Sequence, residues 1–287
     1  MPIDIEKLMS FEIPVGRQVV TPEAIALYAL SVGVGRDPLD RNQLAYVDPL
    51  RGPVVMPSMV LTMAHPGFWM ADPRSGVDPE AVLHASQSFT ILGELPRSGV
   101  VESRSRVTEV FDKGAGSAAL IGTTTDLRDE TGRIFARLER VTFVRNGGGF
   151  GGQATPARAR EAAPDTAPDH VVDLATDPFQ ALLYRLNGDL NPLHSDPAAA
   201  ARVGFAAPIL HGLCTMGVVT HAILAARARY RSQALRSLSL RFVSPVFPGE
   251  TIRTEIWNDG RFRALIPARE TVVVDGGSVE LLEVGDD

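Results

Sequence analysis

The pattern of apolar and polar positions divides the second half of the chain into one long helix followed by strands. Apolar residues fill most positions from about His211 to Arg227, and no charged residue interrupts residues 205–226, which predicts a buried helix. Beyond it, Leu238, Leu240 and Phe242 alternate with polar residues, the period of a half-buried strand. The same criterion predicts strands at residues 235–243, 251–257, 261–266 and 271–274.

The first half shows the same order, a helical segment followed by strands. A proline opens an apolar helical pattern at residues 21–33, and strands are predicted at residues 100–108, 118–126 and 133–144. Glycine-containing turns at residues 112–116 and 129–132 separate these strands.

The two halves also match in sequence. Gly99 lies over Gly249 in a turn between strands, and the helical segments give four aligned pairs, which are Pro22 with Pro178, Leu27 with Leu183, Tyr28 with Tyr184 and Leu30 with Leu186. We therefore predict an internal repeat in which each half packs one buried helix against a curved antiparallel sheet. Such a protein has an α+β fold.

A change in composition marks the boundary between the halves. Residues 147–169 are rich in glycine, then in alanine and proline, as linkers are. We predict an N-terminal domain at residues 1–150, a linker at 151–169 and a C-terminal domain at 170–287. The glycines at 147, 149 and 152 fit a dinucleotide-binding pattern, but no helix of a βαβ unit follows them, so we do not assign a nucleotide site.

The composition indicates a soluble globular protein. Hydrophobic residues make up 45% of the chain and charged residues 22%, and the net charge of −6 argues against a nucleic-acid partner. The single cysteine, Cys214, forms no internal disulfide, which favours a reducing compartment. The N-terminal residues do not resemble a secretory signal. The uncharged stretch at residues 205–226 contains proline, glycine and histidine, which favours a buried helix over a membrane span. We expect a cytoplasmic protein.

Three residues with acid/base chemistry occur close together at Asp189, Asn191 and His194. They lie in a turn, because Asn187-Gly188 ends one helical pattern and Asp196-Pro197 begins the next. A carboxylate and an imidazole on such a loop can converge on one water molecule, as proton transfer requires. Alone, Asp189 would be interpreted as an Asx turn, but the three together favour catalysis.

A second feature follows the loop at Pro208-Ile-Leu-His211-Gly212, where the long helix begins. The free N–H groups of a helix start can bind an anionic oxygen, so Gly212 is a candidate oxyanion donor. His211 is interpreted as a structural histidine. A metal site made of Asp189, His194 and His211 is a minor alternative, because the spacing is not that of a zinc motif. A calcium loop is excluded by Leu193 and His194.

The motifs YRLNGDLNPLHSDP and GFAAPILHGLCT resemble the signature of the hydratase 2 (MaoC-like) enoyl-CoA hydratases, and RFVSPVFPGETIRTEIW resembles that family's strand signature. The resemblance implies a double hotdog fold, with Asp189, Asn191 and His194 in catalysis and Gly212 as the donor to the thioester oxygen. It also places several residues in contact with substrate, namely His84, Ala85, Lys113, Leu190, Pro192, Leu193 and Phe242. Two residues depart from the family pattern: Ala85 replaces a frequent glycine, and Asn187 a frequent serine.

The expected activity is reversible hydration of a trans-2-enoyl-CoA to a (3R)-3-hydroxyacyl-CoA, with no cofactor and no metal. Alternatives are a dehydratase acting on carrier-protein thioesters, a non-catalytic acyl-CoA-binding hotdog protein and a hotdog thioesterase. At the positions equivalent to Asp189 and His194, the first half has Gly33 and Pro38. We therefore expect the first half to bind the acyl chain without catalysing a reaction. The family resemblance also implies a homodimer.

Overall fold

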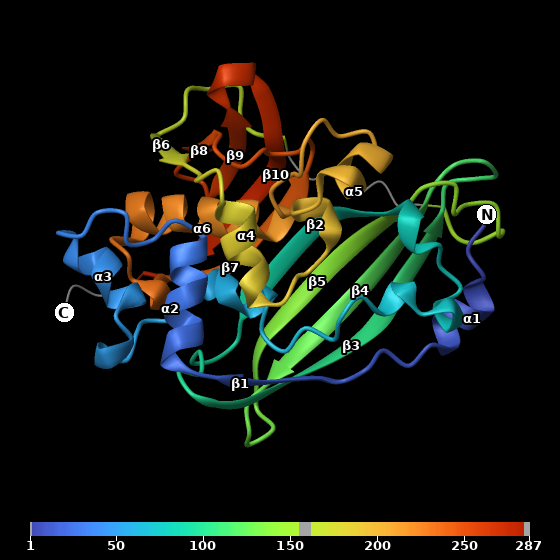
Figure 1. Cartoon of the computed structure of the whole chain (residues 1–287), viewed down its shortest axis with the longest axis horizontal. Coiled ribbons are helices and arrows are strands. Elements are labelled where there is room, and N and C mark those ends of the chain that lie inside the picture. The colour runs from blue at the N-terminus through green and yellow to red at the C-terminus, as the bar shows by residue number, and fades with distance from the viewer. Residues whose placement is uncertain (1, 155–161, 284–287) are drawn as a thin grey trace.

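The computed structural model describes residues 2–154 and 162–283. Its strands form one antiparallel sheet in the order β1-β3-β4-β5-β2-β7-β10-β9-β8-β6 (Figure 1). The strands are β1 (Gly16–Val20), β2 (Val82–Ile91), β3 (Gly99–Asp112), β4 (Ala119–Arg128), β5 (Ile134–Val144), β6 (His170–Ala175), β7 (Leu235–Phe242), β8 (Thr251–Ile256), β9 (Arg261–Ile266) and β10 (Thr271–Leu281).

Helices cover one side of the sheet, and α2, α3, α4 and α6 gather at the left of Figure 1. The α-helices are α1 (Ile5–Ser10), α2 (Pro22–Ser31), α3 (Arg41–Val47), α4 (Gln180–Tyr184), α5 (Pro197–Arg202) and α6 (Gly212–Ala228). The 3₁₀ segments are η1 (Pro49–Arg51), η2 (Pro57–Leu61), η3 (Trp69–Ala71), η4 (Pro73–Ser75), η5 (Pro79–Ala81), η6 (Arg185–Asn187), η7 (Pro192–His194), η8 (Ser232–Ala234) and η9 (Pro267–Arg269).

The strand order is symmetric about the β2–β7 pair. Five strands from the first half lie on one side of that junction and five from the second half on the other. The junction is antiparallel, with Phe89 opposite Leu238 and Ser88 opposite Ser239, as a two-fold relation between the halves requires. The predicted α+β class and the internal repeat are thus confirmed.

Residues that match in the sequence repeat also contact one another. The rings of Tyr28 and Tyr184 have centroids 6.1 Å apart, and the Asn187 amide donates a hydrogen bond to the Ser31 hydroxyl at 2.9 Å. Both pairs join α2 to the α4–η6 segment. Equivalent residues touch only near a symmetry axis, so this contact marks the axis between the halves.

The long helix α6 is the centre of the second half. Most of its positions are fully buried against η2, β6, β7 and β8, which explains why its sequence is uniformly apolar. Among the described residues, no helix is long and apolar enough to cross a membrane. The prediction of a buried helix at residues 211–227 is therefore confirmed.

Within residues 2–154, the described part of the first half, there is no counterpart of that long helix, which corrects the expectation of one such helix in each half. The short segment η2 precedes β2 as α6 precedes β7, and its residues are all buried. The chain then leaves the helical path at Ala64, which has φ 50°, and Pro66-Gly67 follows. Pro57 begins η2 where Gly212 begins α6.

The glycine-rich run at the end of the first half is part of a turn. The Asp112 carboxylate accepts N–H groups from Gly149 and Gly151 as well as from Gly114, at 2.7–2.8 Å. These N–H groups are therefore occupied and do not form a phosphate cradle. Residues 155–161 of the predicted linker lie outside the described residues.

Candidate active site

The loop after α4 is shaped by its own side chains. Gly188 ends η6 with φ 112°, a conformation that suits glycine. The Asp189 carboxylate then accepts the N–H of Asn191 at 3.2 Å, and the Asn191 amide oxygen accepts the N–H of Leu193 at 3.0 Å. The second bond caps η7, which carries His194 into the interior. The Asx turn considered for Asp189 is therefore present, and it serves to place the loop.

His194 has one ring nitrogen fixed and one free. Its Nδ1 lies 2.8 Å from the carbonyl oxygen of Ile209. Because a carbonyl only accepts, Nδ1 carries the proton and Nε2 retains its lone pair. A carboxylate oxygen of Asp189 and a ring nitrogen of His194 lie within 4.8 Å of each other. A water molecule can bridge groups at that spacing, so the loop brings an acid/base pair together as predicted.

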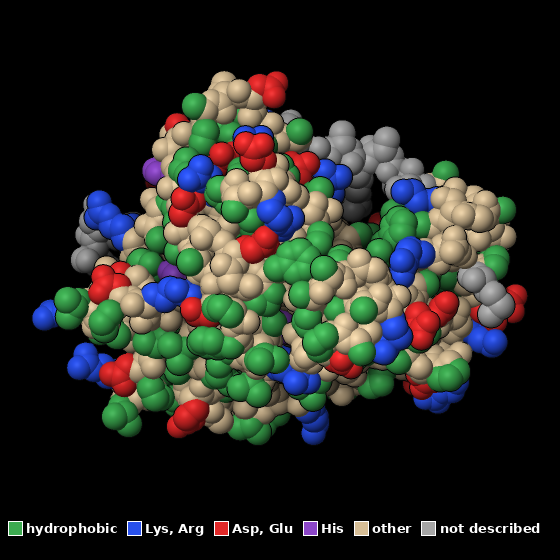
Figure 2. All heavy atoms as spheres, turned by 45° about the horizontal axis from the view of Figure 1, so that its top comes forward, with side chains coloured by type: hydrophobic (Ala, Val, Ile, Leu, Met, Phe, Trp, Pro, Cys, Tyr) green, Lys and Arg blue, Asp and Glu red, His purple; other side chains and the backbone are tan. Residues whose placement is uncertain are grey.

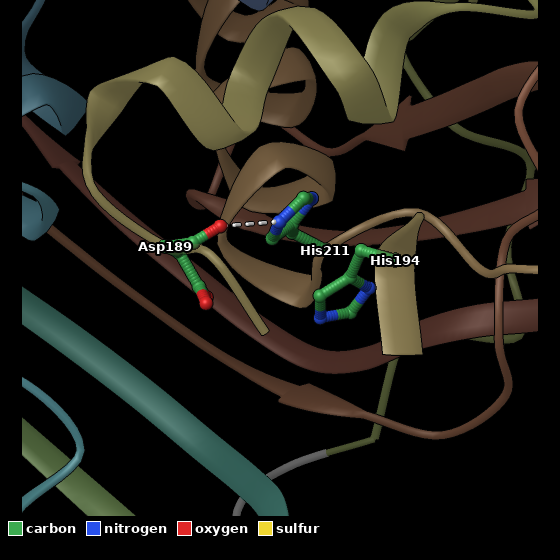
Figure 3. A group of neighbouring side chains, drawn as sticks. All are labelled: Asp189, His194 and His211. Carbon is green, nitrogen blue, oxygen red and sulfur yellow. Dashed lines mark hydrogen bonds between the residues drawn. The ribbon is translucent and has the colours of Figure 1, made fainter. Parts of the chain in front are cut away.

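His211 belongs to the same cluster, although the sequence indicated only a structural role. Its ring stacks on that of His194 with centroids 3.7 Å apart and an interplanar angle of 27°. Its Nε2 donates to the backbone carbonyl of Asp189 at 3.2 Å, and the ring of Tyr184 packs against it at 5.0 Å. Figure 3 shows the Asp189 carbonyl turned to His211 while the Asp189 side chain points in another direction. His211 thus contacts both members of the pair.

Burial keeps both histidines neutral at pH 7. It lowers the pKa of His194, and the nearby charge of Asp189 partly opposes this change. The pKa of His211 falls to about 4, first because of burial and then because of the neighbouring His194. A neutral His194 with a free Nε2 can accept a proton, as a general base must.

The same cluster could in principle hold a metal ion, because one donor atom from each of Asp189, His194 and His211 lies within 4.8 Å of the others. Stacked rings hold their lone pairs in two nearly parallel planes. Zinc bound by two histidines needs both lone pairs to converge at about 2.0–2.1 Å. The arrangement therefore suits a water molecule better than an ion.

Gly212 follows His211 and begins α6, so its N–H precedes the first helical hydrogen bond and is free to bind a ligand. A Cβ at this position would lie 3.2 Å from Cε1 of Phe242, closer than most such contacts allow. Phe242 in turn packs edge-on against His84, with ring centroids 4.8 Å apart. The predicted residues Gly212, Phe242 and His84 therefore lie together where β2 of the first half meets β7 of the second.

Two other predicted substrate contacts, Ala85 and Lys113, come from the first half of the chain. Ala85 sits at a register shift in β2, where it is an extra residue that turns His84 out of the regular pleat. Lys113 is exposed, with its ammonium 5.9 Å from the ring of Phe143. Phe143 pairs with Leu83, so Lys113 lies at the same end of the sheet as His84.

The loop residues divide by exposure. Leu190 and Pro192 are exposed, whereas Leu193 is half-buried. Asn191 is also exposed, and its side-chain oxygen caps η7, so it orients His194 through the backbone. One polar residue near the site was not predicted from the sequence. Arg140 on β5 bonds to Nδ1 of His84 at 3.1 Å and stood out in the sequence only as a charge in a predicted strand.

Two family patterns match the chain, one in each half. Residues 19–146 match the family described as MFE-2 hydratase 2 N-terminal domain, and residues 159–278 match the MaoC like domain. The first range ends before the predicted linker at residues 151–169, and the second begins within it, at residue 159.

Similar proteins cover nearly the whole chain. Enoyl-CoA hydratase ChsH3 of Mycobacterium tuberculosis is 38% identical over 98% of this chain and 99% of its own length. The crystal structure of a MaoC-like dehydratase from Phytophthora capsici has a TM-score of 0.84 at 31% identity, covering 99% of this chain and all of that one. A protein of M. tuberculosis described as a double hotdog fold superposes with a TM-score of 0.57 at 17% identity, over 96% of this chain and 95% of its own. That last likeness concerns the fold alone, and it confirms the predicted double hotdog.

Proposed function

Because the chain belongs to the MaoC-like hydratase 2 family, we propose that it is an (R)-specific enoyl-CoA hydratase. It adds water reversibly to a trans-2-enoyl-CoA and gives a (3R)-3-hydroxyacyl-CoA. The observation that carries this proposal is the placement of Asp189 and His194, because a ring nitrogen of His194 lies within 4.8 Å of the Asp189 carboxylate and Nε2 of His194 is free.

The water molecule binds between these two groups. Nε2 of His194 accepts one proton as the water oxygen attacks C3. The Asp189 carboxylate accepts a hydrogen bond from the other water hydrogen, which stays on the oxygen that becomes the 3-hydroxyl, and so orients the molecule. The imidazolium that forms is stabilised by the charge of Asp189, which raises the pKa of His194 against the effect of burial. The pair then returns a proton to C2, so the reaction adds one water molecule across the C2–C3 double bond.

Negative charge moves to the thioester oxygen as C3 is attacked. The N–H of Gly212 and the positive end of the 17-residue helix α6 stabilise that oxygen. Asn191 holds η7 in place, and His84 and Phe242 form the wall beside Gly212. This chemistry uses no cofactor or metal, so incubation with a chelator should leave the rate unchanged.

The direct test is the hydration rate of trans-2-enoyl-CoAs, followed by loss of the conjugated thioester absorbance. We expect Asp189→Asn and His194→Ala each to lower kcat by about 10²-fold or more, with the thermal unfolding curve close to that of the wild type. Near wild-type turnover in either variant would contradict the assignment of the pair. Chiral analysis of the product tests the (3R) configuration.

The alternatives are distinguishable in the same assay. Faster turnover of a carrier-protein thioester than of the CoA thioester of one acyl group would indicate a carrier-protein dehydratase. Release of free thiol would indicate a thioesterase. Binding without turnover would indicate a non-catalytic acyl-CoA-binding protein, a function that the acid/base pair of Asp189 and His194 argues against.

For the assembly we propose a homodimer. An apolar stripe formed by Phe179, Leu182, Leu186 and Leu190 is half exposed or more, and hydrophobic side chains gather over α2 and α4 in Figure 2. Monomeric proteins rarely expose large apolar patches. Light scattering should give twice the chain mass, and Leu182→Glu should reduce the measured mass to that of one chain.

For the location we propose the cytoplasm, which cell fractionation would test.

A further inference from the structure

A cavity of about 60 Å³ lies between the first half of the sheet and the start of α6. It reaches Leu213, the residue after Gly212, so it adjoins the candidate oxyanion site. Its remaining walls come from β2, β3, β4, β5 and the segment around η2. The cavity therefore occupies the place where the first half lacks a long helix, and an acyl chain held at Gly212 can extend into it.

The walls of this cavity are unusually polar for a pocket that receives an alkyl chain. Half of its lining residues are polar, including Ser105, Thr125 and Arg140. The hydroxyls of Ser105 and Thr125 bond to each other at 2.7 Å. Such a pair uses only one of its two O–H donors, so the other remains available to a ligand.

Arg140 is a cation that forms no ion pair among the described residues. Its guanidinium donates a hydrogen bond to Nδ1 of His84, which is neutral because burial holds the pKa of that imidazole well below its usual value. Nε of Arg140 is buried without a partner. Asp189 is close enough to interact with Arg140 electrostatically but does not form an ion pair with it. A guanidinium has five N–H donors, so most of its donors have no acceptor here.

A buried charge without an ion-pair partner lowers the stability of the fold, and proteins usually pair their buried cations. Arg140 also has the planar fork that binds a carboxylate through two parallel hydrogen bonds. The missing partner is therefore best supplied by an anionic ligand that enters the cavity with the substrate.

We propose that the Arg140 cavity is a carboxylate-binding subsite, and that the preferred substrate is a short enoyl-CoA with a second carboxylate on its acyl chain. The inference rests on the proposed hydratase function and names its substrate class. Arg140 bonds to His84, which packs on Phe242 beside Gly212, so the carboxylate lies only a few carbon atoms beyond the reacting C3. A cavity of about 60 Å³ accepts a small charged group and excludes a long alkyl tail.

The first experiment measures binding without chemistry. Glutaryl-CoA and pentanoyl-CoA have saturated five-carbon chains of equal length, with and without the terminal carboxylate, and calorimetric titration compares their Kd values. We expect glutaryl-CoA to bind about 10- to 100-fold more tightly, the range for a charge-assisted bidentate contact. Equal affinities, or tighter binding of pentanoyl-CoA, would overturn the proposal.

The second experiment assigns the discrimination to Arg140. In Arg140→Gln the preference for glutaryl-CoA should disappear, while the affinity for pentanoyl-CoA stays near that of the wild type. The matched control is Arg104→Gln, which removes the same charge from β3 on the face opposite to Ser105 and should leave both affinities unchanged. A loss of affinity for both thioesters alike in Arg140→Gln would show a structural role instead. The wild-type comparison decides the question even if the variant does not fold.

Turnover measurements distinguish the proposed carboxylate subsite from the hydratase function on which it rests. Pairs of 2-enoyl-CoAs of five to eight carbon atoms, with and without a terminal carboxylate, are compared by kcat/KM. Hydration of the neutral members alone would refute the carboxylate subsite and leave the hydratase function intact. No hydration of any member, together with tighter binding of glutaryl-CoA, would refute the hydratase function while supporting the subsite.

Discussion

His211 allows a sharp test of how the catalytic loop is held. It is 1% exposed, donates to the Asp189 carbonyl, and lies between the rings of His194 and Tyr184. It is also directly bonded along the chain to Gly212. One side chain thus connects the acid/base pair to the oxyanion donor. Its replacement by alanine should release Asp189 and His194 from their relative positions while leaving both groups present.

The size of the effect follows from the contacts that are lost. The hydrogen bond to the carbonyl contributes about 0.5–1.5 kcal/mol to stability. Each of the two ring contacts contributes about 0.5–1.5 kcal/mol. We therefore expect His211→Ala to lower the free energy of unfolding by about 2–4 kcal/mol, which a domain stable by about 5–15 kcal/mol survives. A displacement of about 1 Å between reacting groups costs roughly 10²-fold in rate, so kcat should fall by about 10- to 100-fold.

The assay combines steady-state hydration with denaturant unfolding. The matched control is His221→Ala, because His221 is another buried histidine, lies on α6 and bonds to the Tyr230 hydroxyl at 3.0 Å, away from the loop. This control should lose comparable stability and keep its kcat. If His211→Ala also keeps kcat within about threefold of the wild type while losing stability, then His211 supports only the fold and the reasoning is wrong.

Further predictions concern binding, packing and pH. Lys113→Ala should raise KM for CoA thioesters at low salt with little change in kcat, and added salt should reduce the difference because an exposed phosphate contact is screened. Gly212→Ala should lower kcat by about tenfold or more with little change in melting temperature, because the added Cβ would lie 3.2 Å from Cε1 of Phe242 and displace the N–H or the ring. Burial lowers the pKa of His221 from 6.5 to about 4, so the unfolded chain binds the extra proton and stability should fall as pH drops from 6.5 to 4. Urea titrations should show that His221→Gln flattens this fall. Titration of Asp189→Asn with an enoyl-CoA should give one site per chain, whereas two equivalent sites would show a working pocket in the first half.

The sequence predicted those parts of the site that depend on local structure. Asp189, Asn191 and His194 lie on one loop whose turns are set by neighbouring residues, so their proximity follows from spacing alone. Arg140 and His84 are 56 residues apart and meet only because β2 and β5 pair. The role of His211 was also hidden, because its contact with Asp189 depends on how the start of α6 packs under the loop. Contacts of this kind require the register of the sheet, which one sequence does not reveal.

In the fold, too, the elements set by local sequence were predicted and those set by long-range pairing were not. Strands with clear alternation, such as β7 and β9, were predicted within a residue or two of their ends. The strand β2 was missed, since Ser86, Gln87 and Ser88 give it little apolar character. These residues lie at the junction of the halves, where β7 pairs with one edge of β2 and β5 with the other. These polar residues lie in a strand because it is paired on both edges, which is a property of the tertiary structure. Strand propensity along the sequence therefore does not predict β2.

The asymmetry between the halves explains why a duplicated fold has one candidate active site. Gly33 and Pro38 replace the acid/base pair in the first half, and Pro57 stands where Gly212 begins α6. Proline has no N–H, so even a restored acid/base pair in the first half would face no oxyanion donor. The short η2 segment has a further consequence, because a helix as long as α6 would fill the space of the present cavity. The features that leave the first half without an acid/base pair or an oxyanion donor therefore also leave space for the present cavity.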